Sequence, residues 1–331
     1  MRARRHPDRE ENRMNQTSAL AAPAVEDALA ELRPALLAYC YRMLGSVLEA
    51  EDAVQETMMR AWRSAARLED PAGLRPWTYR IATNVCIDAS ADRKRRALPM
   101  DLVAAADPRG ELGAPLPEST WVQPFPSSPT VDPSEQAVSN ESVRLAFVAA
   151  LQYLLPRQRA VLILRDVLCW RAAEVAELLD LSVDAVNSML RRARAALAQA
   201  QRADGARPLD PIDTGLLERY VAAFERFDIA AIVSLLRDDA IIDMPPVAFW
   251  LFGRESFRDW LIGSDIGCRR KRLIPIQANG CPAAALYRET DGRMTAFAIQ
   301  VLECSGGEIA RLHTFLQPEL FGAFGLPNQL D

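Results

Sequence analysis

Prolines are concentrated in one segment of this chain, and that segment divides it. Between Leu98 and Pro133 the sequence holds eight prolines and few long apolar runs. Proline has no backbone N–H to donate and its φ angle is fixed, so a segment this rich in proline cannot carry regular ladders. We therefore predict an extended, partly mobile linker over residues 98–135, with folded domains on both sides.

The flanking segments differ in pattern, which predicts a multidomain fold. Helical periodicity fills residues 25–97 and 136–203, so each is predicted to be an all-α domain. After a second break, "ADGARPLDP", helices precede apolar segments of strand length in residues 212–331. That order predicts an α+β domain with a curved antiparallel sheet. Residues 1–24 are predicted to be a flexible tail, within which Met14 is an alternative start.

Composition excludes several classes of protein. The net charge of −5 means that any contact with nucleic acid must come from local patches. Six scattered cysteines without a CxxC pair indicate reduced thiols in a cytoplasm, and two histidines leave little material for a metal site. No apolar run reaches the length of a membrane span. We predict a cytoplasmic protein without a metal or another cofactor.

The stretch "VAELLDLSVDAVNSMLRRARAAL", residues 175–197, predicts a helix-turn-helix motif. Ala176 allows close helix crossing, Asp180 tolerates a left-handed turn, and Ser182 is a good N-cap. The shared core would comprise Val175, Leu179, Leu181, Val186 and Met189. The second helix would then present short polar groups to base edges and arginines to phosphates. These candidate DNA-binding residues are Ser182, Asp184, Asn187, Ser188, Arg191, Arg192 and Arg194.

Upstream, "EAEDAVQETMMRAW" predicts an amphipathic helix with an acidic outer face. Its buried side would comprise Ala50, Val54, Met58, Ala61 and Trp62. Asp52, Gln55, Glu56 and Met59 would lie across from them, on a face that suits a basic protein partner better than a nucleic acid. The alternative is an ordinary solvated helix face.

The next helix, "RPWTYRIATNVCIDASADRKRR", has the opposite character. Trp77, Ile81 and Val85 mark its buried side, and the helix ends in a basic run. Polar donors beside aromatic groups and a basic run suit unpaired bases and backbone phosphates. The candidate nucleic-acid contacts are Trp77, Arg80, Thr83, Asn84, Arg93, Lys94 and Arg96.

The order of these features resembles the extracytoplasmic-function (ECF) sigma factors of bacterial RNA polymerase. The likeness rests on "YCYRMLGSVLEAEDAVQETMMRAWR" and "WTYRIATNVCIDASADRKRR" for region 2, and on "LPRQRAVLILRDVLCWRAAEVAELLDLSVDAVNSMLRRARAAL" for region 4. Residues 212–331 are similar to the SnoaL-like domains fused to some of these factors. The resemblance implies a non-enzymatic protein that binds core RNA polymerase and promoter DNA and directs transcription initiation.

The resemblance also implies a role for each surface. The helix of Asp52, Gln55 and Glu56 would dock on the β′ clamp helices, and region 4 would meet the β flap. The helix of Trp77 would recognise and help melt the −10 element, and the segment 67–74 would accept a flipped-out base. The helix 182–194 would recognise the −35 element. A linker of about 35 residues spans more than about 50 Å when extended, so both elements could be bound at once.

The C-terminal domain offers a candidate pocket for a small-molecule ligand. A curved sheet wrapped by helices commonly encloses a pocket, and Asp243 and His313 would be an acid–base pair within it. The alternative is that these residues belong to the core. The domain as a whole is predicted to be a docking module that regulates regions 2 and 4 in cis. A glycine-rich "DGGG" motif of one related group has at best "TDGRM" as its counterpart here. The candidate pocket residues are Tyr220, Phe224, Asp243, Trp250, Tyr287, Phe297 and His313.

Two other classes of protein are compatible with parts of this sequence. A one-component regulator would use the helix-turn-helix for operator binding and the C-terminal pocket for a ligand. A SnoaL-type isomerase or cyclase would use the pocket for catalysis. Neither class gives a role to the acidic face of residues 49–56 or to the aromatic and basic helix that follows it.

Overall fold

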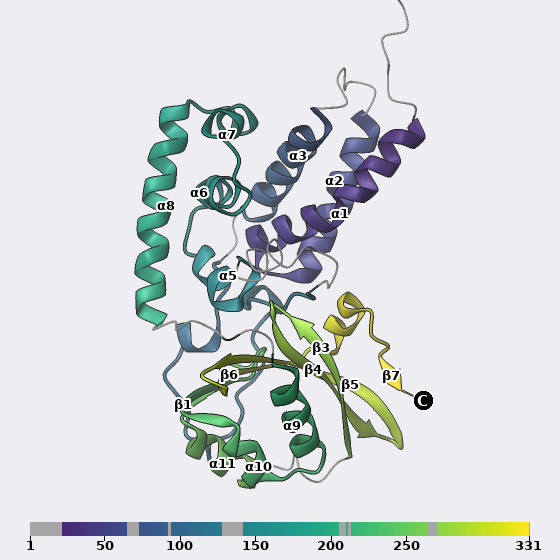
Figure 1. Ribbon diagram of the computed structural model, residues 1–331, viewed down its shortest axis with the longest axis vertical. Coiled ribbons are helices and arrows are strands. Elements are labelled where there is room, and N and C mark those ends of the chain that lie inside the picture. Colours follow the sequence, from purple (N-terminus) through teal and green to yellow (C-terminus); the bar gives the residue numbers. More distant parts are fainter. Residues whose placement is uncertain are drawn as a thin grey trace, which may run out of the picture.

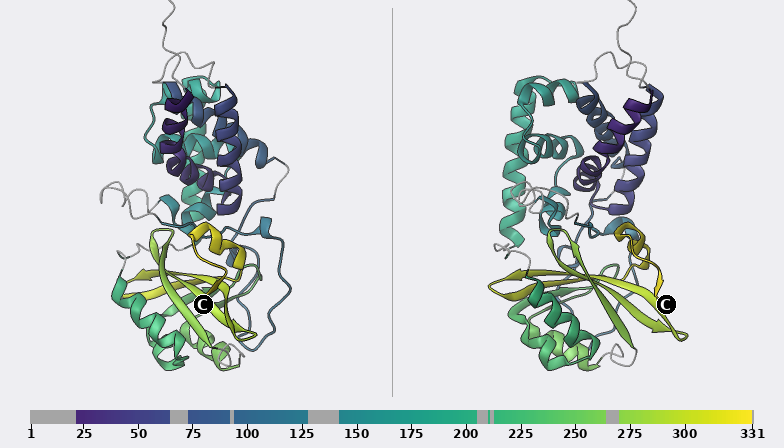
Figure 2. Two further views of the ribbon diagram at one scale, coloured as in Figure 1. Left: turned by 90° about the vertical axis from the view of Figure 1, so that its right-hand side faces the viewer. Right: turned by 45° about the vertical axis from the view of Figure 1, so that its right-hand side comes forward.

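The computed structural model describes residues 22–64, 73–91, 94–127, 142–204, 210, 213–263 and 270–330. Helices from both sides of the predicted linker form one lobe, which we call the helical lobe (Figure 1). The C-terminal sheet and its own helices form a second lobe below it, the sheet lobe (Figure 2). None of the described helices is long and apolar enough to cross a membrane.

The first part of the helical lobe consists of α1 (Ala22–Leu44), α2 (Val47–Ser64) and α3 (Leu74–Ala89). Gly45, with φ +72°, provides the left-handed turn between α1 and α2. Ser46 then caps α2, because its Oγ accepts a hydrogen bond from the backbone N–H of Glu49 at 3.2 Å. Apolar faces of the three helices meet in a core that includes Leu36, Val54 and Tyr79, all fully buried.

The second part consists of α5 (Leu145–Leu151), α6 (Pro156–Leu162) with a π-helical turn η6 (Ile163–Val167), α7 (Ala172–Leu179) and α8 (Val183–Asp204). The helix-turn-helix prediction is confirmed by the geometry between α7 and α8. Asp180 is left-handed, with φ 55° and ψ 53°. The Oγ of Ser182 accepts a hydrogen bond from the N–H of Ala185 at 3.1 Å, as an N-cap does.

These two groups of helices share one continuous core. The ring of Tyr79 on α3 lies 5.2 Å from that of Trp170, which precedes α7. The buried guanidinium of Arg159 on α6 donates to the carbonyl of Met43 at the end of α1 and to the side chain of Gln152, 2.8 Å away. The α1–α3 and α5–α8 groups are therefore packed directly on each other.

The described part of the linker carries only the short turns η4 (Pro99–Asp101) and η5 (Glu118–Thr120), together with isolated bridges. Residues 98–127 thus lack regular ladders, as predicted, but they are packed against the rest of the protein rather than free of it. Trp121 and Val122 are fully buried. Backbone groups of the linker also pair with the sheet lobe, for example Leu116 N–H with the carbonyl of Pro246 at 2.8 Å. Buried apolar side chains and paired backbone groups hold the segment in place.

The sheet lobe contains one curved sheet with the strand order β2-β1-β6-β5-β4-β3, and β7 adds to β5. Adjacent strands are antiparallel except β1 and β6, which are parallel, so the sheet is mixed rather than wholly antiparallel as predicted. A parallel pair requires a long connection rather than a hairpin. The strands are β1 (Leu236–Asp243), β2 (Trp250–Phe252), β3 (Lys271–Ala278), β4 (Cys281–Thr290), β5 (Arg293–Ser305), β6 (Glu308–Phe315) and β7 (Gln329–Leu330).

The two faces of this sheet have different neighbours. One face packs against α9 (Thr214–Glu225), α10 (Ile229–Ser234) and α11 (Arg254–Gly263) in a core of its own. The other face contributes Val301, Phe315 and their neighbours to the core that also holds the helical lobe. The turn η8 (Pro318–Phe324) joins the same core and contacts α2. The sheet lobe is therefore joined to the helical lobe through apolar residues of this face, through η8 and through the linker.

Candidate polymerase and DNA interfaces

The outer face of α2 is open to solvent. Asp52 and Gln55 are exposed, and Glu56 forms an ion pair with Arg60 one turn later at 2.6 Å. Met59 is 46% exposed. Within the described part of the chain Asp52 forms no ion pair, whereas the neighbouring Glu49 pairs with Arg96. The predicted acidic face is therefore available to a partner, and its role in docking stays a prediction.

Trp62 extends this face, which corrects the prediction that it is buried. The indole is 62% exposed, while the adjacent Ala61 is buried in a small cluster with Leu29 and Leu74. Because successive helix positions are about 100° apart, placing Ala61 inward turns Trp62 outward, to the side of Met59. A large exposed indole beside an acidic surface is typical of a protein–protein contact. The signal in the sequence was its spacing of seven residues from Gln55, which places both side chains on nearly the same side of the helix.

On α3, the predicted outward residues divide into two sets. Arg80 and Asn84 are exposed, and Trp77 is half-buried against the cluster around Ala61. Thr83 is fully buried, so the prediction that it points outward is wrong. Its hydroxyl donates to the carbonyl of Tyr79 at 2.7 Å, one turn back, and accepts from the hydroxyl of Tyr39 on α1 at 2.8 Å. Thr83 is therefore a packing residue between α3 and α1.

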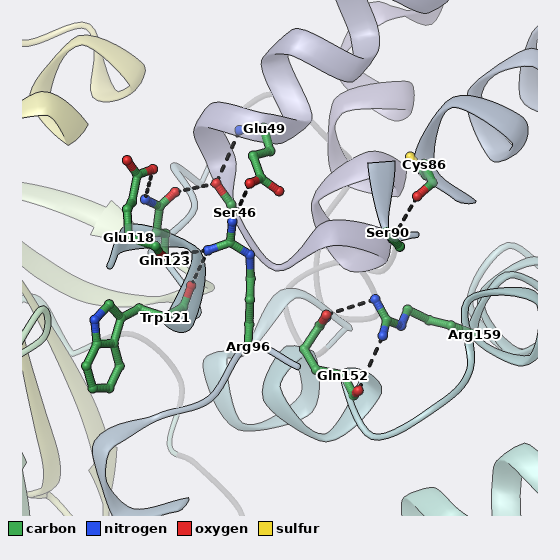
Figure 3. Close-up of polar contacts among 10 residues, drawn as sticks. All are labelled: Ser46, Glu49, Cys86, Ser90, Arg96, Glu118, Trp121, Gln123, Gln152 and Arg159. Atoms are coloured by element: carbon green, nitrogen blue, oxygen red, sulfur yellow. Dashed lines mark hydrogen bonds and ion pairs between the residues drawn. The ribbon is translucent and has the colours of Figure 1, made fainter. Parts of the chain in front are cut away.

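The prediction that Arg96 contacts nucleic acid is also wrong. It is 5% exposed rather than free to approach a DNA backbone. Its guanidinium forms a 2.6 Å ion pair with Glu49 at the start of α2 and donates to the carbonyls of Glu118 and Trp121 (Figure 3). Arg96 thus fastens the linker to α2, because a buried arginine needs several acceptors at once.

The other residues of the basic end are placed differently. Lys94 is exposed, and the guanidinium of Arg95 lies 3.6 Å from the centre of the Tyr153 ring. Arg93 lies outside the described residues, as does most of the segment 67–74 that was expected to accept a flipped base. Lys94 is therefore accessible, and its role as a phosphate contact stays a prediction.

The DNA-binding residues predicted on α8 mostly line its solvent side. Ser182, Asp184, Asn187, Arg191 and Arg192 are exposed, and Ser188 is half-buried. Arg194 is exposed as well, and its guanidinium forms a bidentate pair with Asp166, at 2.7 and 2.8 Å. A polar N-terminal half followed by arginines is the arrangement that a recognition helix needs in a major groove.

In the sheet lobe, the seven candidate pocket residues do not line one pocket. Tyr220 and Phe224 lie in the core between α9 and the sheet, where the Tyr220 hydroxyl donates to the side chain of Gln300 at 3.1 Å. Tyr287 is on the opposite face and donates to the carbonyl of Pro327 at 2.8 Å. Because side chains alternate along a strand, the prediction of a common pocket is wrong.

The remaining candidates have separate partners. The indole N–H of Trp250 donates to the carbonyl of Val103 in the linker at 2.9 Å. The ring of Phe297 lies 3.9 Å from the guanidinium of Arg288. Both aromatic residues are thus engaged in structural contacts rather than in a shared cavity.

Asp243 and His313 form the predicted hydrogen-bonded pair, but in an unexpected place. Nδ1 of His313 lies 2.6 Å from Oδ2 of Asp243, and both side chains are fully buried. Alternation along β1 and β6 places them on the face away from α9, because Ile242 and Leu312 face the helices. Glu303 lies 3.8 Å from the other ring nitrogen. Burial lowers the pKa of His313, but the two carboxylates raise it more, to about 10.

A buried imidazole whose pKa is raised to about 10 is poorly suited to proton transfer near neutral pH, since a general base should titrate near the working pH. The opposite effect acts on Glu303: burial raises its pKa, but His313 and nearby arginines lower it below its usual range. The three side chains form an ion network inside the protein. This arrangement argues against the acid–base role that the sequence analysis considered.

Comparison with known proteins agrees with the geometry. Residues 29–96 match the family model of sigma-70 region 2, and residues 144–197 match that of sigma-70 region 4. The first match covers α2 and α3, and the second covers the helix-turn-helix. A chain with both regions is a sigma factor, which binds core RNA polymerase and promoter DNA.

The relatives define the family more narrowly. The chain is 44% identical over 307 residues to the ECF RNA polymerase sigma factor SigG of Mycobacterium tuberculosis, covering 90% of this chain and 82% of that protein. It is 31% identical over 210 residues to the ECF RNA polymerase sigma factor SigJ of the same species, covering 63% of this chain and 61% of SigJ. The chain belongs to the family of ECF RNA polymerase sigma factors.

A solved structure shares the overall fold. The crystal structure of the extracytoplasmic function sigma factor SigJ of Mycobacterium tuberculosis matches with a TM-score of 0.59 and 24% identity. The match covers 92% of this chain and all of that chain. We call α1–α3 region 2 and α5–α8 region 4 from here on.

Proposed function

We propose that this sigma factor docks on core polymerase through the outer face of α2, against the β′ clamp helices. An acidic surface with Asp52, Gln55 and Glu56 in its centre and two exposed apolar side chains, Met59 and Trp62, supports this assignment. Charge steers association and a desolvated indole contributes most of the affinity at such contacts. Region 4 would meet the β flap.

We further propose that Trp77, Arg80 and Asn84 on α3 act on the −10 element, with Lys94 near the DNA backbone. The exposed polar and arginine side chains of α8 would act on the −35 element. Exposed donors on α3 suit an unpaired strand, whereas a capped helix with a polar N-terminal half suits a major groove. Thr83 and Arg96 are not included, because both are buried in structural contacts.

The packing of region 2 on region 4 carries the functional conclusion. Elements centred about 25 base pairs apart lie about 85 Å apart along duplex DNA at 3.4 Å per base pair. Regions that share one core cannot meet both elements at that separation. We therefore propose that this closed arrangement is the resting state. It would prevent promoter recognition by spacing rather than by covering α3 or α8, whose proposed contact residues are largely exposed.

In this proposal the C-terminal domain regulates the factor in cis by favouring the closed arrangement. Apolar residues on one face of its sheet belong to the same core as the helical lobe, and the linker lies between the two. Docking on polymerase would come first, because the outer face of α2 is open in the closed protein. Separation of regions 2 and 4 would follow on the polymerase.

The test is reconstitution of the full chain with core polymerase on genomic DNA. We expect run-off transcripts from specific start sites with holoenzyme and not with core polymerase alone. Free protein should bind the corresponding promoter duplex weakly, because each region alone has few contacts and the two are wrongly spaced. Tight, sequence-specific binding of the duplex without polymerase would contradict the proposal and favour a one-component regulator.

A further inference from the structure

The turn between β3 and β4 inserts one side chain into the helical lobe. Asn279 is left-handed, with φ 54°, and Gly280 follows with φ 69°. An Asn-Gly pair is the preferred sequence for a tight hairpin turn of this kind, because both central residues need a positive φ. Turn residues are usually solvated, yet Asn279 is only 1% exposed. The tip of this hairpin is therefore buried between the two lobes.

Asn279 pairs first with the linker. Its backbone N–H donates to the carbonyl of Phe125, and its Oδ1 accepts from the N–H of Phe125, both at 2.8 Å. The asparagine thus pairs with Phe125 much as a neighbouring strand would, using its side chain for one of the two bonds. The adjacent Gly280 N–H donates to Oγ of Ser127 at 2.8 Å, which extends this contact.

The two hydrogens of the Asn279 amide group reach regions 2 and 4. Nδ2 donates to the hydroxyl of Tyr41 on α1 at 2.8 Å and to the carbonyl of Val143, just before α5, at 2.5 Å. One side chain therefore contacts region 2, the linker and the start of region 4. All the hydrogen-bonding capacity of its amide group is engaged, apart from one lone pair of the oxygen.

The partners of Asn279 are themselves held in place. The Tyr41 hydroxyl donates to the carbonyl of Gln123 at 2.8 Å, and the Tyr41 ring stacks on that of Phe125 with centroids 4.5 Å apart. The neighbouring Arg42 donates to Oγ of Ser142 at 2.7 Å, next to Val143. Region 2, the linker and region 4 thus meet at one buried point. Asn279 is the residue of the C-terminal domain that is inserted there.

We propose that Asn279 is the positioning residue by which the C-terminal domain holds regions 2 and 4 in the closed arrangement. This inference rests on the proposed function, in which that arrangement is the resting state. The physical reason is the cost of leaving buried polar groups without partners. If Asn279 loses its amide donors while the lobes stay closed, the Val143 carbonyl loses this hydrogen bond, and the Tyr41 hydroxyl keeps only the bond that it donates to Gln123. Opening exposes both groups to water, so it becomes easier.

The experiment replaces the donors and keeps the shape. Asn279→Asp is nearly isosteric and tolerates a left-handed backbone, but its carboxylate cannot donate to Tyr41 or Val143. Asp291→Asn is the matched control. Asp291 has φ 51°, precedes Gly292 in the β4–β5 turn of the same sheet, and is exposed.

Two native cysteines report opening in the full chain. Cys281 is buried on the sheet face that joins the helical lobe, and Cys304 is buried in the core against the helices of the sheet lobe. Separation of the lobes exposes Cys281, while Cys304 is exposed only when the sheet lobe itself unfolds. The rate of iodoacetamide modification, resolved for each cysteine by peptide mass spectrometry, follows the population of each open form.

We expect Asn279→Asp to raise the modification rate of Cys281 about tenfold or more, since at least one hydrogen bond's net contribution is lost. Cys304 should keep its rate, and Asp291→Asn should change neither. Tyr41→Phe removes the acceptor of the same bond and keeps the ring, so it should raise the Cys281 rate to a smaller extent. An unchanged Cys281 rate in Asn279→Asp, or an equal rise for both cysteines, would overturn the proposal.

Transcription by the same variant separates this inference from the proposed function. Faster modification of Cys281 with unchanged run-off transcription would support the proposal that Asn279 holds the lobes together. It would refute the proposal that the C-terminal domain regulates transcription in cis. Faster modification together with more transcript per holoenzyme would support both.

Discussion

The outer face of α2 and the buried cluster of Asp243, His313 and Glu303 in the sheet lobe both contain acidic side chains, but only those on α2 are exposed to solvent. On α2, Asp52 and Gln55 remain exposed beside Met59 and Trp62. In the sheet lobe, Asp243 and His313 are bonded to each other and sealed from solvent. Functional surfaces are therefore recognised by what remains free after folding rather than by residue chemistry alone. Substitutions should divide accordingly, into those that affect assembly and those that affect stability.

The largest effect is expected at the buried pair. Asp243→Asn should lower the free energy of unfolding by about 3 kcal/mol, because it leaves the buried His313 charge without its main partner. Urea unfolding measures this, and polymerase affinity should not change. Asp238→Asn is the control, since Asp238 lies on the same strand with a side chain 85% exposed, and it should cost less than about 0.5 kcal/mol. Loss of polymerase binding in well-folded Asp243→Asn would show that the buried pair also affects assembly.

Charge reversal on α2, in contrast to Asp243→Asn, should lower polymerase affinity and leave stability unchanged. Asp52→Lys with Glu56→Lys should weaken binding to core polymerase at least about 100-fold, because a central attraction becomes a repulsion. The thermal midpoint should stay nearly constant, since both side chains are on the surface. Glu255→Lys with Asp259→Lys changes the same charges at the same spacing on α11, and it should leave affinity unaltered. Equal affinity for both double variants, measured by fluorescence anisotropy, would refute docking through α2.

The buried pair should also make the stability of the protein depend on pH. Folding raises the pKa of His313 from 6.5 to about 10, so the native state retains a proton that the unfolded chain releases. Stability should therefore fall as pH rises above about 6.5, by up to about 1.4 kcal/mol per pH unit. Measurements between pH 6.5 and 8 avoid the buried thiols. His313→Gln should remove this slope, whereas the same slope in both proteins would assign it to other groups.

The sequence predicted local features of this chain correctly because local contacts determine them. Asp180 and Ser182 form the turn and cap of the helix-turn-helix from bonds within a few residues. The errors fall where distant segments meet. Thr83 is covered by Tyr39 of α1, and Arg96 is covered by the returning linker. Periodicity shows that a helix has two sides but not which distant segment covers each side.

The candidate pocket failed for a related reason. Its residues were grouped by type. Side chains alternate between the two faces of a strand, however, so Gln300, which bonds Tyr220, and Tyr287 lie on opposite faces of the sheet. Which face is sealed depends on how the sheet lobe joins the helical lobe. Asn279 shows the same limit, because an Asn-Gly turn predicts a hairpin but not that its tip is buried between Tyr41 and Val143.

Trp62 tests whether the apolar end of the α2 face contributes to docking. Trp62→Ala should weaken polymerase binding about tenfold, as expected when a partly desolvated indole is removed from a contact. Stability should change by less than about 0.5 kcal/mol, since the side chain is mostly exposed in the free protein. Phe252→Ala, at another exposed aromatic residue in the sheet lobe, should not alter affinity. A large loss of stability in Trp62→Ala would contradict the exposed position of the indole and indicate that it packs in the core.

The smallest effects separate two neighbours on α3. Thr83→Val keeps the shape but removes the acceptor of the Tyr39 hydroxyl, so we expect a loss of about 1 kcal/mol in stability. Promoter opening by the holoenzyme should be unchanged, because Thr83 never reaches solvent. Asn84→Ala should do the reverse: stability is kept and opening is reduced about threefold to tenfold, measured by permanganate reactivity of the −10 thymines. If Thr83→Val impaired opening while Asn84→Ala did not, the nucleic-acid face of α3 would have to be on its other side, and region 4 would then cover it in the closed protein.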